Sequence, residues 1–145
     1  MEQGKNQEKK KYPEFPVLVV DDDKNFLKSI ETTLLLRGIT NVECCQDSVE
    51  VIPLLEKRKY SCILLDLKME GITGEELLKK ITADYPEIPV IILTEVNMLD
   101  IAVNCIKHGA FDYIVKPFDT EKLIKTIGKS LEREPEQSNI KKENE

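Results

Sequence analysis

The sequence predicts an α/β fold in which a five-stranded parallel sheet lies between two layers of helices. Short runs of valine, isoleucine and leucine alternate five times with longer amphipathic segments. Nearly continuous apolar runs are typical of strands buried on both faces, and the amphipathic segments have the length of connecting helices. Five strand-helix units are too few for a closed barrel of eight, so we expect an open three-layer sandwich.

The first half of the chain contains three of the five predicted strands, at residues 16–21, 42–46 and 61–66. A helix over 24–37 follows the first strand, with Asp23 as its N-cap. The next helix begins after Asp47 or Ser48 and ends near residue 58. Pro53 lies inside it, and a proline there is expected to kink the helix or delay its start.

The second half continues the same alternation of helix and strand. Glycine and proline residues separate the elements, as expected for connections between them. The predicted elements are a helix from Gly74 or Glu75 to about 84, a strand at 90–94, a helix at 98–108, a strand at 112–115 and a helix at 119–132 that is capped by Asp119 or Thr120. With right-handed crossovers, the expected strand order is 2-1-3-4-5, as in flavodoxin-like folds.

Length and composition indicate one domain over residues 15–132, because 145 residues provide a single hydrophobic core. The polar residues 1–14 are expected to form a disordered tail, and 133–145 a polar tail or the start of a linker. A net charge of -6 argues against direct binding of nucleic acid. The sequence has neither a membrane-spanning apolar run nor a signal peptide pattern, which predicts a cytoplasmic protein without membrane contact.

Four of the apolar runs end at a polar residue that chemistry could use: Asp21, Asp66, Thr94 and Lys116. Ligands of open parallel sheets bind outside the carboxyl ends of the strands, so we expect these side chains to share one crevice. The strand order places Asp21 and Asp22 beside Asp66. Three neighbouring carboxylates repel one another unless a cation compensates them, and Mg²⁺ prefers such hard oxygen ligands.

Asp66 is the candidate nucleophile because its carboxylate follows the most apolar run of the chain. A carboxylate can attack phosphorus and form an aspartyl phosphate, and a metal ion beside it neutralises charge during the transfer. The hydroxyl of Thr94 and the ammonium of Lys116 are suited to contact phosphoryl oxygens.

The segments VLVVDDD, LLDLKMEGITG, VIILT and GAFDYIVKPF resemble the receiver domains of two-component response regulators. The resemblance covers about residues 16–132. It implies that Asp66 accepts a phosphoryl group from phosphohistidine on a histidine kinase or phosphotransfer protein. It also implies that Asp21, Asp22 and the backbone carbonyl of Lys68 help to bind Mg²⁺, together with Asp66.

The same resemblance implies a conformational switch and a partner surface. Thr94 and Tyr113 would move together after phosphorylation, and Lys116–Pro117 would be a cis peptide bond. The surface formed by the segments 98–108, 112–115 and 119–132 would then change its affinity for a downstream protein, an output domain missing from this chain, or a second copy in a homodimer. Such a protein catalyses only its own phosphorylation and dephosphorylation.

Two other functions stay open at this point. A Mg²⁺-dependent phosphatase that uses an aspartyl phosphate usually has a second acid two residues after the nucleophile, where this chain has Lys68. A degenerate receiver would serve only as a protein-interaction module. The intact acid pair, Asp66, Thr94 and Lys116 argue against that reading. Glu95 keeps it open, because its carboxylate at the crevice mouth could repel a phosphodonor. Glu70, where the family usually has proline, is expected to loosen the loop after Asp66.

Overall fold

The computed structural model describes residues 10–133 and confirms the predicted sheet. All strand pairs are parallel, and their order is β2-β1-β3-β4-β5. The strands are β1 (Val17–Val20), β2 (Val42–Cys45), β3 (Cys62–Leu65), β4 (Val90–Thr94) and β5 (Asp112–Val115). This is the expected flavodoxin-like order. The connections between strands run toward one edge of the sheet up to β2 and toward the other edge from β3 onward, so the switch lies between β1 and β3.

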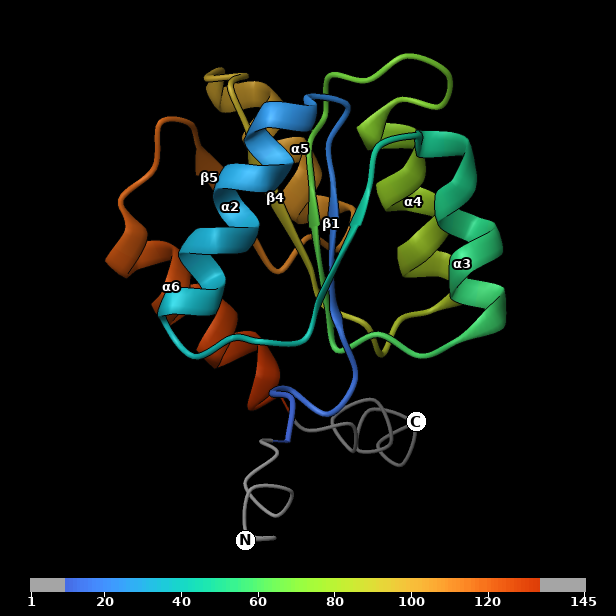
Figure 1. Cartoon of the computed structure of the whole chain (residues 1–145). Coiled ribbons are helices and arrows are strands. Elements are labelled where there is room, and N and C mark those ends of the chain that lie inside the picture. Colours follow the sequence, from blue (N-terminus) through green and yellow to red (C-terminus); the bar gives the residue numbers. More distant parts are fainter. Residues whose placement is uncertain (1–9, 134–145) are drawn as a thin grey trace, which may run out of the picture.

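Five helices cover the two faces of the sheet (Figure 1). They are α2 (Lys24–Leu36), α3 (Val51–Lys57), α4 (Gly74–Asp84), α5 (Leu99–Lys107) and α6 (Thr120–Leu131). Helices α2 and α6 pack on one face, and α3, α4 and α5 pack on the other. Each helix therefore buries its apolar side against the sheet, which gives the three-layer arrangement that the sequence predicts.

Successive side chains of the central strands alternate between the two helical layers. In β1, Leu18 and Val20 belong to the core beneath α3, α4 and α5, while Val17 and Val19 belong to the core beneath α2 and α6. All four side chains are fully buried. Complete burial of such a side chain stabilises the fold by roughly 1.5–3 kcal/mol, which explains why the apolar runs show no polar alternation.

Side-chain caps fix where the helices begin. Asp23 accepts hydrogen bonds from the backbone N–H groups of Asn25 and Phe26, which confirms it as the N-cap of α2. Asp119 caps α6. Thr73 forms a capping box at the start of α4, a cap that was not predicted from the sequence. These caps satisfy backbone donors at the ends nearest the predicted crevice.

The second predicted helix starts late, as Pro53 indicated. Asp47 caps the short 3-10 helix η1 (Ser48–Glu50), and the α-helical hydrogen bonding of α3 begins only at Val51. Pro53 therefore lies in the first turn of α3, where its missing N–H group leaves no helical hydrogen bond unmade.

The amino-terminal segment differs from the expected tail at residues 12–14. The carbonyl of Tyr12 accepts hydrogen bonds from the N–H groups of Thr40 and Asn41. The Asn41 side-chain amide also donates to the carbonyls of Pro13 and Glu14. These contacts fix the segment beside the start of β2. The remaining tail predictions, for 1–9 and 134–145, lie outside the described residues.

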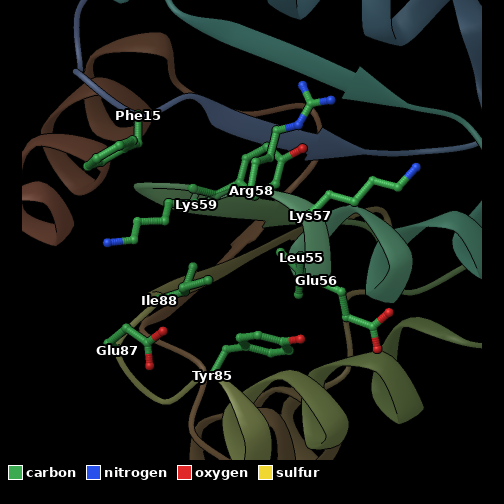
Figure 2. A pocket seen from close by; sticks show the side chains of 10 residues that line it. Phe15, Leu55, Glu56, Lys57, Arg58, Lys59, Tyr85, Glu87 and Ile88 are labelled. Atoms are coloured by element: carbon green, nitrogen blue, oxygen red, sulfur yellow. The ribbon is translucent and has the colours of Figure 1, made fainter.

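A hollow of about 400 Å³ lies at the amino ends of the strands. Figure 2 shows Phe15 and Lys59 on one side of it, and Tyr85 and Ile88 facing them from the segment that joins α4 to β4. Along the part of the chain that the structure describes, no helix is both long and apolar enough to span a membrane.

Candidate functional site

The register of β1 and β3 brings two acidic side chains together at the carboxyl end of the sheet. Val20 is paired with Leu65, so Asp21 and Asp66 leave adjacent strands side by side. The N–H group of Asp66 donates to the carbonyl of Val20 at 3.0 Å, which extends the strand pairing to the acid. Asp21 is 2% exposed and Asp66 is 7% exposed. Both carboxylates are thus held at the floor of a crevice.

Asp21, Asp22 and Asp66 form the acid cluster of this crevice. One carboxylate oxygen of each lies within 4.8 Å of the others, and only Asp22 is exposed. Burial raises the pKa of Asp21 above its ordinary value, Lys116 opposes that rise, and the nearby charge of Asp66 adds to it. A set of three carboxylates with solvent access through Asp22 fits a hard divalent cation such as Mg²⁺.

Lys116 lies between the acid cluster and an aromatic ring. Its Nζ atom is 2.6 Å from Oδ2 of Asp21 and 3.8 Å from Oδ2 of Asp66. The same atom is 3.8 Å from the ring centroid of Phe26. Its side chain is only 12% exposed. The backbone places it there because the Lys116 N–H group donates to the carbonyl of Thr94, which continues the pairing of β4 and β5.

Thr94 and Tyr113 are linked through one residue of the loop after β4. The Thr94 hydroxyl accepts a hydrogen bond from the N–H group of Val96 at 3.3 Å. The Tyr113 hydroxyl donates to the carbonyl of Val96 at 2.7 Å. Burial raises the pKa of Tyr113 to about 12, so the hydroxyl stays protonated and can donate at neutral pH. A shift of Val96 would therefore affect both side chains.

The crevice has a volume of about 270 Å³. Thr94 is fully buried and lies outside the set of residues that line it. The crevice is lined by Asp21, Asp22, Asp23, Asp66, Lys68, Glu95 and Lys116. Glu95 is exposed at the rim and forms no salt bridge within residues 10–133. Its negative charge can therefore attract or repel a charged group that enters the crevice.

The loop after Asp66 is held by hydrogen bonds to a residue of η1. The buried hydroxyl of Ser48 donates to the carbonyl of Glu70 at 2.8 Å and accepts from the N–H group of Ile72 at 3.0 Å. These bonds fix both sides of Gly71, whose φ of 84° favours glycine. The expected loosening by Glu70 is therefore opposed by Ser48, which the sequence pattern indicated only as a helix cap.

Gly74 allows the start of α4 to approach the backbone of the acidic segment. A Cβ atom at this position would lie 2.3 Å from the carbonyl oxygen of Asp66 and 2.5 Å from Cα of Leu67. The Gly74 N–H group donates to the carbonyl of Leu67. The sequence predicts Gly74 only as a helix start, because no local pattern shows which backbone lies against it. Any larger residue would displace the chain that carries Asp66.

Comparison with known proteins identifies the family. The family model of the response regulator receiver domain matches residues 17–128. The chain belongs to this family, as the four sequence segments suggested. The bond between Lys116 and Pro117 is cis, as the resemblance implied.

Two curated relatives and two solved structures illustrate the similarity. The response regulator protein FleR of Pseudomonas aeruginosa is 36% identical over 114 residues, which are 78% of this chain and 24% of FleR. The DNA-binding transcriptional regulator NtrC of Escherichia coli is 36% identical over 121 residues, covering 83% of this chain and 26% of NtrC. The chain therefore spans about a quarter of the length of these relatives.

Among solved structures, a receiver domain protein from Clostridium thermocellum aligns with a TM-score of 0.76 and 30% identity, over 82% of this chain and 95% of that one. The receiver domain of NtrX from Brucella abortus aligns with a TM-score of 0.75 and 28% identity, over 81% of this chain and 99% of that one.

Proposed function

We propose that this protein is a phosphorylation-controlled signalling switch whose phosphoacceptor is Asp66. The observation that carries the proposal is the crevice in which the buried Asp66 carboxylate faces Asp21, Asp22 and the Lys116 ammonium. Membership of the receiver family supports the same reading. The phosphodonor is phosphohistidine on a histidine kinase or phosphotransfer protein.

In the proposed transfer, an oxygen of Asp66 attacks the phosphorus atom of the donor. The new O–P bond forms while the N–P bond of phosphohistidine breaks, and the leaving imidazole nitrogen keeps the electron pair of that bond. Mg²⁺, when bound by the three carboxylates and the backbone carbonyl of Lys68, supplies positive charge to the transferring group.

Lys116 and Thr94 contact the phosphoryl oxygens in this proposal. Lys116 is well placed because its ammonium is already 3.8 Å from Asp66 and needs only a short movement away from Asp21. Thr94 must turn its hydroxyl from the Val96 N–H group toward the crevice. Both movements exchange one polar partner for a more highly charged one, which favours them after phosphorylation.

The switch is proposed to pass from Thr94 through Val96 to Tyr113, and from there to the surface of α5, β5 and α6. Apolar side chains on this surface support its use in binding, because a row of exposed apolar groups along one helix is typical of a contact face. They are Leu99, Val103 and Ile106 on α5, with Met98 at its start. The partner is a second copy, a downstream protein or an output domain of the longer protein.

Two features bear on the wider role. Relatives such as the DNA-binding regulator NtrC are about four times as long as the matched segment. This supports an output region outside this sequence, and any DNA binding would belong to that region and not to the receiver domain. Lys68 lies where a phosphatase would carry its second acid, which argues against turnover of other phosphoesters. The cytoplasmic location expected from the sequence stays a prediction.

Phosphorylation with acetyl phosphate and Mg²⁺, followed by intact-mass measurement, tests the proposal. The wild-type chain should gain one phosphoryl group, and Asp66→Asn should gain none. Asp84→Asn, an exposed acid at the end of α4, is the matched control and should react like wild type. A phosphoryl group on Asp66→Asn would overturn the assignment, and an unreactive wild-type chain would favour the degenerate receiver.

A further inference from the structure

The ring of Phe26 forms one wall around the ammonium of Lys116. Phe26 lies in the first turn of α2 and is half-buried against the core beneath α2 and α6. The distance from Nζ of Lys116 to its ring centroid is 3.8 Å, well within the range of a cation–π interaction. On the other side, the same ammonium contacts Asp21 and Asp66. The cation is thus enclosed by the ring and the acids.

Two contacts fix the position of Phe26, one through its backbone and one through its ring. Its backbone N–H group donates to Asp23, the N-cap of α2, at 3.2 Å. Its ring meets Phe118 in an edge-on arrangement, with centroids 6.4 Å apart and ring planes at 86°. This geometry is favourable for aromatic pairs and holds the face of Phe26 toward Lys116. The ring is therefore a rigid surface on which the ammonium rests.

The partners of Lys116 differ in whether a divalent cation would compete for them. Asp21 is its nearest partner at 2.6 Å, yet Asp21 also belongs to the acid cluster that suits a divalent cation. An ammonium that is only 12% exposed cannot replace a lost partner freely with water. The Phe26 ring, in contrast, is not a ligand for Mg²⁺, so its contact with Lys116 does not compete with a cation at the acid cluster.

We propose that Phe26 is a positioning residue that keeps the Lys116 ammonium beside Asp66 while Asp21 serves a bound cation. The inference rests on the proposed function, because it assigns Phe26 a part in the same phosphotransfer. A purely structural role would require only an apolar side chain of similar size. Attraction of an ammonium also requires the electron-rich face of the ring, which gives the two roles different outcomes.

Substitution separates these roles. Phe26→Leu should lower the rate of phosphorylation by acetyl phosphate at saturating Mg²⁺ by about three- to tenfold, the range expected for a partly desolvated cation–π contact. Phe26→Trp should retain more activity than Phe26→Leu. Phe111→Leu is the matched control, because Phe111 packs on the same core but precedes β5 at the other end of the sheet. It should react like wild type.

Fluorinated phenylalanines placed at position 26 keep the ring's shape and weaken its negative face, so they test the proposal without unfolding the core. The phosphorylation rate should fall stepwise with the number of fluorine atoms. Equal rates across this series, or a wild-type rate in Phe26→Leu, would overturn the proposal.

A second measurement needs no phosphorylation. The Lys116 ε-methylene protons should show an upfield ring-current shift in the NMR spectrum, and this shift should persist when Mg²⁺ is added. Phe26→Leu should abolish it, whereas Phe111→Leu should not. Loss of the shift in wild type on adding Mg²⁺ would refute the positioning role. If wild type failed to accept phosphate but kept the shift, the proposed function would fail while the placement of Lys116 stood.

Discussion

The two ends of the sheet differ in how far their charged side chains are buried and paired. The hollow at the amino ends is the larger of the two, at about 400 Å³ against about 270 Å³ for the crevice at the carboxyl ends. Around the hollow, Glu43 is paired with the exposed Arg58 and with the hydroxyl of Tyr60. In the crevice, Asp21 and Asp66 are buried beside each other with one ammonium between them. Buried, only partly compensated charge, and not volume, distinguishes the candidate site.

This difference follows from the parallel arrangement of the strands. In every strand, the residue after the last apolar position lies at the same end of the sheet. Acids and a lysine that are far apart in sequence therefore meet there. The amino ends receive the residues that precede each strand, and these come from turns whose charged side chains extend into water. We therefore expect equivalent changes to have larger effects at the carboxyl end.

The largest difference is expected between two glycines in helices. Gly74→Ala should destabilise the fold by about 3 kcal/mol, because its Cβ atom would overlap the backbone of Asp66 and Leu67. A Cβ atom at Gly128 in α6 would meet no atom within 4 Å, so Gly128→Ala should stabilise the protein by about 0.5–1 kcal/mol. Urea denaturation of both variants measures the contrast. Equal changes in the free energy of unfolding would show that the backbone of Asp66 and Leu67 can move away from a new Cβ atom without cost.

Binding of Mg²⁺ should stabilise the protein in a pH-dependent way. Burial raises the pKa of Asp21, so its ionisation costs stability as pH rises through that value, and a bound cation removes this cost. The increment should therefore be absent near the ordinary pKa of 3.8 and grow toward neutral pH. At a concentration of 100 Kd it reaches about 2.7 kcal/mol.

Calorimetric melting with and without Mg²⁺ across this pH range measures the increment. The double variant Asp22→Ala, Asp66→Ala is the control and should show none. An equal rise in Tm in wild type and in the double variant would place the metal elsewhere.

A pair of serines sharpens the comparison. Ser48 and Ser61 each donate a hydrogen bond to a backbone carbonyl, at the carboxyl and amino ends respectively. Ser48→Ala should cost about 2 kcal/mol, because the loop loses two hydrogen bonds to a buried hydroxyl. Ser61→Ala should cost about 1 kcal/mol or less, since water can replace its single bond. A larger loss in Ser61→Ala, measured by urea denaturation, would reverse the expected order.

The smallest effect concerns Glu95 at the rim of the crevice. Its carboxylate forms no salt bridge among the described residues and is expected to repel a negatively charged phosphodonor, so Glu95→Gln should speed phosphorylation by acetyl phosphate by about two- to threefold at low salt. The gain should shrink as salt screens the charge. Glu87→Gln, at the hollow of the opposite end, is the matched control and should not change the rate. A gain that salt leaves unchanged would exclude charge repulsion as the cause.

The strands and their order could be predicted from the sequence because they depend on local apolar runs and on general rules of topology. The placement of Asp21 beside Asp66 follows from the same rules. Ser48, Gly74 and Phe26 could not be predicted, because their roles depend on which distant backbone or side chain packs against them. A serine after a strand, a glycine before a helix and a phenylalanine in a first turn carry no local sign of these contacts.

The contact between Lys116 and Asp21 has a consequence for the charge balance of the crevice. With all three acids ionised, the single ammonium leaves this cluster with two net negative charges, and the burial of Asp21 opposes that state. One divalent ion makes the cluster neutral, whereas a monovalent ion does not. Conversion of the Asp66 carboxylate to an acyl phosphate of about two negative charges then adds one net negative charge. In the proposed function, phosphorylation therefore takes the metal-bound cluster from neutral to one net negative charge, which is still less negative than the cluster without a metal ion.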